Sequence, residues 1–160
     1  MSYQRSPVLC VSDFLNELLA RLYLNVARQT TYISGIDVIR QLEQYKNSGC
    51  MSKTTHFVTF DVSDLYTMIP RNGAIEALAR FLTKHSKKGA IGNLKIDTIL
   101  RLARLVLDTN CFAYDNKYYK QIRGGAMGSP FTMVLANIYM LEWEQPLIEH
   151  QQRHNELYGR

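Results

Sequence analysis

FVTFDVSDLYTMIP, residues 57–70, is the stretch that decides which fold class we expect. The run from His56 to Phe60 is short, apolar and rich in strand-favouring residues, so it predicts a buried strand that ends at Asp61. The carboxyl end of such a strand is the usual place for a ligand-binding group. A carboxylate in that position loses its hydration, which is unfavourable unless a cation or hydrogen-bond donors contact it. Magnesium is usually bound by one or two carboxylates together with the phosphates of a substrate. Asp61 is therefore a candidate metal ligand; the alternative is that it caps the next turn.

A glycine-rich stretch, RGGAMGSP at residues 123–130, is the second candidate site. Ser129 is a good N-cap and Pro130 a good first helical residue, so we expect a helix from here to about Pro146. Free backbone N–H groups at a helix start favour phosphates or base edges. The stretch matches neither the Walker A spacing nor G-x-G-x-x-G, so taken alone it is explained equally well by a hairpin-to-helix turn.

The rest of the chain predicts helices and one hairpin. Ser12 is a candidate cap for a helix with apolar residues at helical spacing over 14–22, and a second helix is indicated over 38–45. After Pro70, two amphipathic helices are indicated over 75–82 and 96–107, with a loop at 85–93. Asp115 and Asn116 lie between two β-prone arms over 111–122, as in a tight hairpin. This order predicts a mixed fold, α/β or α+β, and we take α+β with helices packed on a small antiparallel sheet.

The composition is that of one ordinary globular domain. Of the 160 residues, 46% are hydrophobic and 21% charged, and no apolar run reaches the roughly 20 residues of a bilayer span, so we expect no membrane partner. The net charge is +5 and the excess lies mainly in residues 61–110, which fits a polyanionic partner, although a solvated basic face is the alternative. Cys10, Cys50 and Cys111 have no C-x-x-C spacing, so we expect buried free thiols in a reducing compartment.

Tyrosines and basic residues alternate in the predicted hairpin. Such side chains can stack on bases and contact phosphates in nucleic-acid grooves. Cross-strand packing explains the tyrosines equally well. The residues concerned are Tyr114, Tyr118 and Tyr119 with Lys117, Lys120 and Arg123.

FDVSDLYTMIP, residues 60–70, resembles the first catalytic motif of reverse transcriptases, motif A, and YYKQIRGGAMGSPFTMVLANIYM, residues 118–140, resembles the following motif B. The resemblance is closest to Penelope-like retroelement reverse transcriptases and spans about residues 50–145. It implies a partial right-hand polymerase fold, with part of the fingers and the palm. The parts would be a helical fingers-side region over 1–55, the motif A strand and turn over 56–70, helices over 71–110, a hairpin over 111–123, and the motif B loop and helix over 124–146.

The resemblance also implies a role for each residue of the two motifs. Asp61 would be the first aspartate of a two-metal site for magnesium or manganese, with the backbone carbonyl of Val62 as a further ligand. Tyr66 would be the steric gate that excludes a ribose 2′-hydroxyl. The incoming nucleotide would be bound at Ser63, Asp64, Tyr66, Gly128 and Ser129. The template would be bound at Gly124, Gly125, Ala126, Met127 and Pro130.

The chain departs from the family pattern in two places. Many reverse transcriptases have Gln-Gly in motif B, where this chain has Gly124-Gly125 with Gln121 further upstream, an arrangement compatible with the Penelope-like version. The Tyr-x-Asp-Asp motif, which supplies the other metal-binding aspartates, is nowhere in the chain, and no two acidic residues are adjacent. The basic region of the fingers also lacks a clear counterpart, and no thumb follows.

The function that the resemblance implies is part of an RNA-directed DNA polymerase, with an RNA template, a DNA primer and deoxynucleoside triphosphates as partners. Its place would be intracellular, in the nucleus for a retroelement. We expect the 160 residues alone to be inactive, because polymerase chemistry needs two cations bridged by several carboxylates. One alternative is a non-catalytic remnant that binds nucleic acid. Another is a phosphatase-like enzyme with Asp61 as nucleophile, which would want a second aspartate where Ser63 stands.

Overall fold

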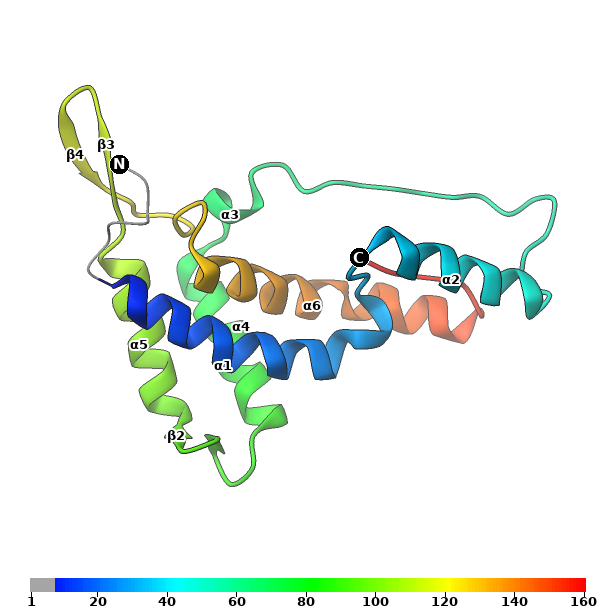
Figure 1. Ribbon diagram of the computed structural model, residues 1–160, viewed down its shortest axis with the longest axis horizontal. Helices are drawn as coiled ribbons and strands as arrows, with labels where there is room; N and C mark the ends of the chain where they lie inside the picture. The colour runs from blue at the N-terminus through cyan, green and yellow to red at the C-terminus, as the bar shows by residue number, and fades with distance from the viewer. Residues whose placement is uncertain (1–7) are drawn as a thin grey trace.

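The computed structural model describes residues 8–160 and shows an elongated helical body with small hairpins attached (Figure 1). The helices differ widely in length, and the strands are short. In chain order the elements are α1 (Leu9–Ala27), the 3-10 turn η2 (Arg28–Thr30), α2 (Gly35–Asn47), α3 (Leu65–Met68), α4 (Arg71–His85), β1 (Ala90–Ile91), β2 (Leu94–Lys95), α5 (Ile96–Asp108), β3 (Cys111–Tyr114), β4 (Lys117–Lys120) and α6 (Pro130–Arg153).

The hydrophobic core lies between α1, α4, α5 and α6. Each helix contributes apolar residues three and four positions apart, so that one face of it is buried. Leu15, Leu78, Ile99 and Phe131, one from each helix, are fully buried. Each such side chain stabilises the fold by about 1.5–3 kcal/mol relative to an exposed one. The helices expected over 14–22, 38–45, 75–82 and 96–107 are thus confirmed, although α2 has no buried residue.

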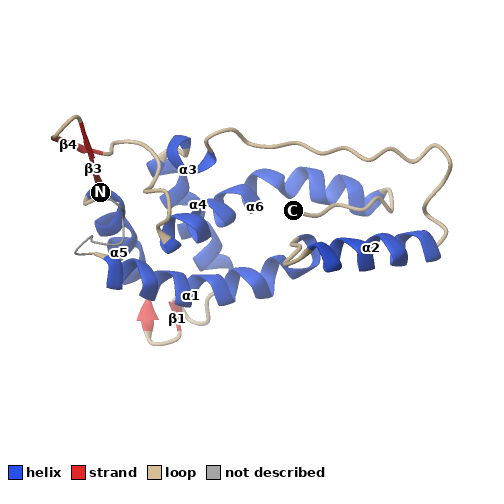
Figure 2. Cartoon of the chain, turned by 45° about the horizontal axis from the view of Figure 1, so that its top comes forward, coloured by secondary structure: helices blue, strands red, loops and turns tan. Residues whose placement is uncertain are grey.

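The mixture of helices and small antiparallel sheets agrees with the α+β class, but the predicted layering is wrong. Each sheet is a separate two-stranded hairpin, β1–β2 or β3–β4. Figure 2 shows the two hairpins at the edges of the helical body. Every residue of β3 and β4 is exposed. The helices pack on one another because two-stranded sheets of this size offer no apolar face large enough to cover them.

The buried strand predicted over residues 56–60 is also a wrong prediction. These residues are extended and exposed, with 69% of Phe57, 83% of Val58 and 57% of Phe60 accessible to solvent. Figure 1 shows the segment as a long stretch between α2 and α3 that runs beside the helices. A strand needs a neighbour to pair its backbone groups, and the described part of the chain supplies none here.

The predicted ends of the first and last helices were partly right. Ser129 caps α6 and accepts a hydrogen bond from the Thr132 N–H at 3.3 Å, and Pro130 is the first helical residue, as expected. Helix α6 continues through the exposed Pro146 to Arg153, with Ile148 buried beyond the proline. Helix α1 begins at Leu9, so Ser12 lies inside the helix and does not cap it.

The β3–β4 hairpin forms where the sequence predicted it. Asp115 and Asn116 have φ of 49° and 56°, the left-handed conformations that a tight two-residue turn requires. The predicted loop at 85–93 in fact contains β1 and the turn into β2.

All three cysteines are free and exposed, so the expectation of buried thiols was wrong. Cys10 lies in the first turn of α1, Cys50 lies beyond α2, and Cys111 lies in the exposed β3–β4 hairpin.

Candidate functional site

The glycine loop, residues 121–129, lies against α3 and the turn that follows it. The Gly124 N–H donates a hydrogen bond to the Ile69 carbonyl at 3.0 Å, and the Gly125 N–H donates one to the Tyr66 carbonyl at 2.9 Å. Figure 1 shows the start of α6 next to α3. The end of residues 57–70 and the glycine loop therefore form one local structure, although they are far apart in sequence.

Both glycines at this contact are required by the close approach of other atoms. Gly124 has φ of +57°, and a Cβ there would lie 2.3 Å from the Tyr66 carbonyl oxygen. A Cβ on Gly125 would lie 2.3 Å from Oγ1 of Thr132. Any side chain at position 124 would meet rigid backbone, so the contact depends on glycine at that position.

Arg71 holds the loop from the other side, and the sequence interpretation missed it. Its Nε donates a hydrogen bond to the Gly124 carbonyl at 2.8 Å, and its Nη1 lies 3.8 Å from Oδ1 of Asp108. Burial lowers the pKa of the Arg71 guanidinium, and Asp108 partly opposes that change. The available signal was a basic residue in the first turn of a helix, where the helix dipole disfavours it.

Asn110 is a second residue that the sequence interpretation missed. When its buried side-chain amide is oriented to satisfy both neighbours, the nitrogen donates to the Val106 carbonyl at 3.1 Å and the oxygen accepts from the Ala126 N–H at 3.2 Å. Its backbone carbonyl accepts a hydrogen bond from the Gln121 N–H at 3.0 Å, and Nε2 of Gln121 donates one to the Gly125 carbonyl, also at 3.0 Å. The base of the β3–β4 hairpin and the glycine loop are thereby held together at the end of α5.

The loop exposes only part of itself. Gly124, Gly125 and Ser129 are buried, whereas Met127 and Gly128 face solvent. Ala126 and Pro130 are half-buried. Tyr66 is exposed in part and lines a small pocket with Gly124 and Gly125. Of the predicted nucleotide and template residues, the structure therefore brings together Tyr66 and the loop, and leaves Met127 and Gly128 as the accessible tip.

The predicted metal ligands, Asp61 and Val62, precede α3 in the chain and make none of these hydrogen bonds. Asp61 is exposed, and the cap position of α3 is occupied by Asp64, with φ of 54°, and not by Asp61. The Asp64 carbonyl accepts from the N–H groups of Thr67 and Met68, each at 3.0 Å. Val62 and Ser63 line an open hollow with Leu65, Met68, Tyr139 and Trp143.

The donor set around Asp61 does not fit a complete two-metal centre. Among residues 8–160, no three His, Cys, Asp or Glu side chains are grouped closely enough to hold a metal ion. One carboxylate and the Val62 carbonyl are too few, because two magnesium ions at a phosphoryl-transfer site are bridged by several carboxylates. Asp61 and Val62 can supply at most part of such a centre.

A buried carboxylate, Glu144, lies in the second half of α6. Glu144 forms an ion pair with Arg160, Nη1 to Oε1 3.0 Å, and Arg160 also donates to the Tyr23 hydroxyl and, at 3.2 Å, to the Asn137 carbonyl. Burial raises the pKa of Glu144, although Arg160 and a hydrogen bond from Tyr158 act in the opposite direction. Burial and the Glu144 charge likewise raise the pKa of Tyr158.

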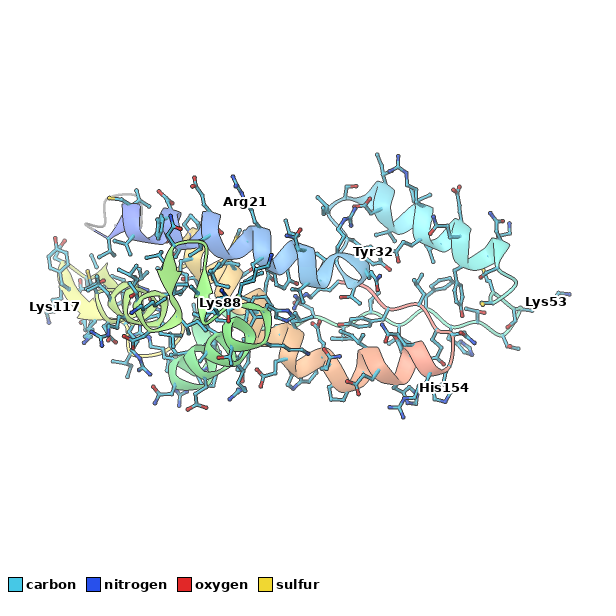
Figure 3. The ribbon with its side chains drawn as sticks, turned by 90° about the horizontal axis from the view of Figure 1, so that it is seen from below. Arg21, Tyr32, Lys53, Lys88, Lys117 and His154 are labelled. Atoms are coloured by element: carbon cyan, nitrogen blue, oxygen red, sulfur yellow. The ribbon has the colours of Figure 1, made fainter. Side chains whose placement is uncertain are left out.

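The same contacts tie the last described residues to the start of the chain. The Tyr32 N–H donates to the Arg160 carbonyl at 2.6 Å, and the Arg160 N–H donates to the Thr30 carbonyl at 2.8 Å. Figure 3 shows Tyr32 beside the C-terminal segment. Arg160 is thus bonded to Glu144, Tyr23 and the backbone around Tyr32, so the cluster joins α1, η2 and α6 and we assign it no ligand.

Comparison of the chain with models of protein families, with curated proteins and with solved structures found no match. In the described part of the chain, no helix is both long and apolar enough to cross a membrane.

Proposed function

We propose that this chain is part of an RNA-directed DNA polymerase, a reverse transcriptase, and that Tyr66 and the glycine loop hold the incoming deoxynucleotide and the template base. The observation that carries the proposal is the pair of backbone hydrogen bonds from Gly124 and Gly125 to Ile69 and Tyr66. Two segments that resemble successive polymerase motifs are in direct contact, and the contact excludes any side chain at Gly124.

Tyr66 is suited to act as a steric gate because its backbone is fixed against the loop. The Gly125 N–H holds the Tyr66 carbonyl, while the ring remains partly exposed. A ring held in this way discriminates against a ribose by excluding the volume of a 2′-hydroxyl. Met127 and Gly128 would contact the template base and nucleotide, because they are the exposed residues between the buried Gly125 and the buried cap Ser129.

The chain on its own is proposed to bind substrates and not to polymerise them. Among the described residues, Asp61 belongs to no group of three or more side chains that could hold a metal ion, so we derive no metal-dependent step from this chain. Polymerisation would require further carboxylates, together with magnesium or manganese, an RNA template, a DNA primer and deoxynucleoside triphosphates. The small number of candidate ligands around Asp61 also favours a second candidate, a non-catalytic retroelement remnant that binds nucleic acid. Either protein would act inside the cell, in the nucleus.

Binding to a labelled DNA primer annealed to an RNA template tests the substrate-holding role. Fluorescence anisotropy should detect binding that weakens steeply with salt. M127E places a negative charge at the loop tip and should weaken binding about tenfold, because a like charge is brought against phosphate. I39E adds the same charge at an exposed apolar position of α2 and should leave binding unchanged. No binding at low salt, or equal loss in both variants, would contradict the proposal.

Primer extension separates the polymerase from the non-catalytic remnant. The 160-residue chain should give no product, and template-dependent extension by this chain would contradict the expectation that it is inactive on its own. A fusion of the chain with a segment that carries Tyr-x-Asp-Asp should extend the primer if the polymerase proposal holds. In that fusion D61A should abolish extension and D13A, an exposed acid of α1, should not. Y66A should raise ribonucleotide incorporation relative to deoxynucleotide incorporation.

A further inference from the structure

The β3–β4 hairpin exposes more aromatic surface than its own folding requires. All eight strand residues are exposed, and Tyr114 and Tyr118 are 71% and 68% accessible. Figure 1 shows the hairpin projecting from one end of the helical body, beyond α5. Contiguous exposed apolar surface on a protein of this kind marks an interaction site more often than it contributes to folding.

The register of the hairpin places most of the rings on one face. Phe112 is opposite Tyr119 and Tyr114 is opposite Lys117, and residues directly opposite each other on antiparallel strands share a face. The rings of Phe112 and Tyr119 are stacked, with centroids 5.6 Å apart and planes 20° apart. The opposite face carries Tyr118 and Lys120, with Ala113 and Cys111 as their cross-strand partners. We call the side formed by Phe112, Tyr114, Lys117 and Tyr119 the aromatic face.

The charge of the hairpin indicates the chemistry of the partner. Over residues 111–123 the basic side chains are Lys117, Lys120 and Arg123, and the one acid, Asp115, lies in the turn. Figure 3 shows Lys117 at the far end of the molecule. Aromatic rings on which bases stack, beside cations that meet phosphates, are the combination that binds single-stranded nucleic acid. Protein–protein interfaces also favour aromatic residues, but they are depleted in lysine.

The aromatic face is also attached to the glycine loop. Gln121 extends the hairpin through its N–H bond to the Asn110 carbonyl, and its side chain bonds to the Gly125 carbonyl. These two bonds fix the base of the hairpin relative to the glycine loop. We propose that the aromatic face binds a single-stranded polynucleotide by base stacking, with Lys117 against its phosphates. This inference depends on the hairpin alone and does not require polymerase activity.

Anisotropy with labelled 12-nucleotide oligouridine, oligothymidine and a DNA duplex of the same length tests the inference. The wild-type chain should bind the single strands more tightly than the duplex. Y114A should weaken single-strand binding at least fivefold, the size of effect expected for one lost stacked base. Y118A removes the same side chain, equally exposed, from the opposite face and should change binding less than twofold. K117Q should lower the slope of log Kd against log salt by about 0.7.

The outcomes separate this inference from the proposed function. Circular dichroism and thermal unfolding should be unchanged in Y114A, because Tyr114 lies outside the helical core. Three results would contradict single-strand binding by the aromatic face: Y114A binds as tightly as the wild type, Y114A and Y118A lose the same amount of affinity, or the chain prefers the duplex. If hybrid binding remains sensitive to M127E while Y114A has no effect, the hairpin inference fails and the proposed function stands. The relative affinities of oligouridine and oligothymidine identify RNA or DNA as the strand bound.

Discussion

The hydroxyl oxygens of Ser12 and Ser129 lie 3.1 Å apart in the core, although 117 residues separate the two serines in the chain. Both side chains are fully buried. Oγ of Ser12 also accepts a hydrogen bond from the Phe131 N–H at 3.2 Å, and Oγ of Ser129 accepts one from the Thr132 N–H. The first turn of α6 is therefore capped from within and from α1, and this fixes the end of the glycine loop.

Replacing Ser12 should destabilise the whole domain. S12A leaves the buried Phe131 N–H without its acceptor, which costs about 1–3 kcal/mol in the free energy of unfolding. S34A removes the side-chain cap of α2, a helix with no buried residue, and should have a much smaller effect on global unfolding. Urea denaturation followed by circular dichroism measures both. Equal destabilisation by the two changes would show that the Ser12 contact does not stabilise the core.

Gly124 and Gly128 provide a matched test of the contact between the loop and α3. Both have positive φ, so alanine at either position incurs about 1–2 kcal/mol of backbone strain. At Gly128 the added Cβ meets nothing within 4 Å, whereas at Gly124 it meets the Tyr66 carbonyl. G124A should therefore lower the melting temperature further than G128A. If the two variants melt together, the loop does not rest on α3 as described.

The hydrogen bond from Arg71 to the Gly124 carbonyl should require a guanidinium. Lysine lacks the second nitrogen that allows Arg71 to approach Gly124 and Asp108 together, so R71K should cost about 1–2 kcal/mol in unfolding free energy. R104K, at an exposed position of α5, is the control and should be neutral. Chemical denaturation of both variants measures their free energies of unfolding. An unchanged value for R71K would show that the guanidinium of Arg71 does not stabilise the glycine loop.

The helices could be predicted from the sequence because their cause is local. The spacing of the leucines alone predicts which face of each helix is buried, as with Leu15 and Leu19 of α1 and Leu78 and Leu82 of α4. The cap at Ser129 and the turn at Asp115 are equally local signals. The strand predicted to end at Asp61 was wrong because a strand depends on a neighbour, which the apolar pattern of residues 56–60 does not reveal.

The candidate site was found only in part for a related reason. The glycines are visible as a pattern in the sequence, and the resemblance of residues 60–70 to motif A implies a role for Tyr66. The groups that hold them were not visible, because Arg71 meets Gly124 across 53 residues and through a backbone carbonyl that any residue would supply. Asn110 likewise bonds to backbone groups of Val106 and Ala126. Contacts between a side chain and distant backbone leave no periodic trace in the sequence.

The ion pair of Glu144 and Arg160 should make stability depend on pH in a defined direction. Burial raises the pKa of Glu144 above its unfolded value of 4.5, so the folded state binds this proton more tightly than the unfolded state. This tighter proton binding adds to the free energy of unfolding. The added stability is fully present below pH 4.5 and is lost as the pH rises through the pKa of Glu144 in the folded protein. Arg160 limits that loss by favouring the charged carboxylate.

R160Q should therefore be more harmful at pH 7 than at pH 4. At pH 7 it leaves a buried carboxylate without its cation, at a cost of about 3 kcal/mol, whereas at pH 4 the carboxyl is largely protonated in the folded state and loses less. R153Q, an exposed arginine at the end of α6, should show no such dependence. The double variant E144Q/R160Q has no carboxylate at position 144, so its loss of stability should also be the same at pH 4 and at pH 7. Urea unfolding of all four proteins at both pH values measures this, and an R160Q deficit of the same size at pH 4 and pH 7 would mean that Glu144 is not a charged partner of Arg160 in the folded protein.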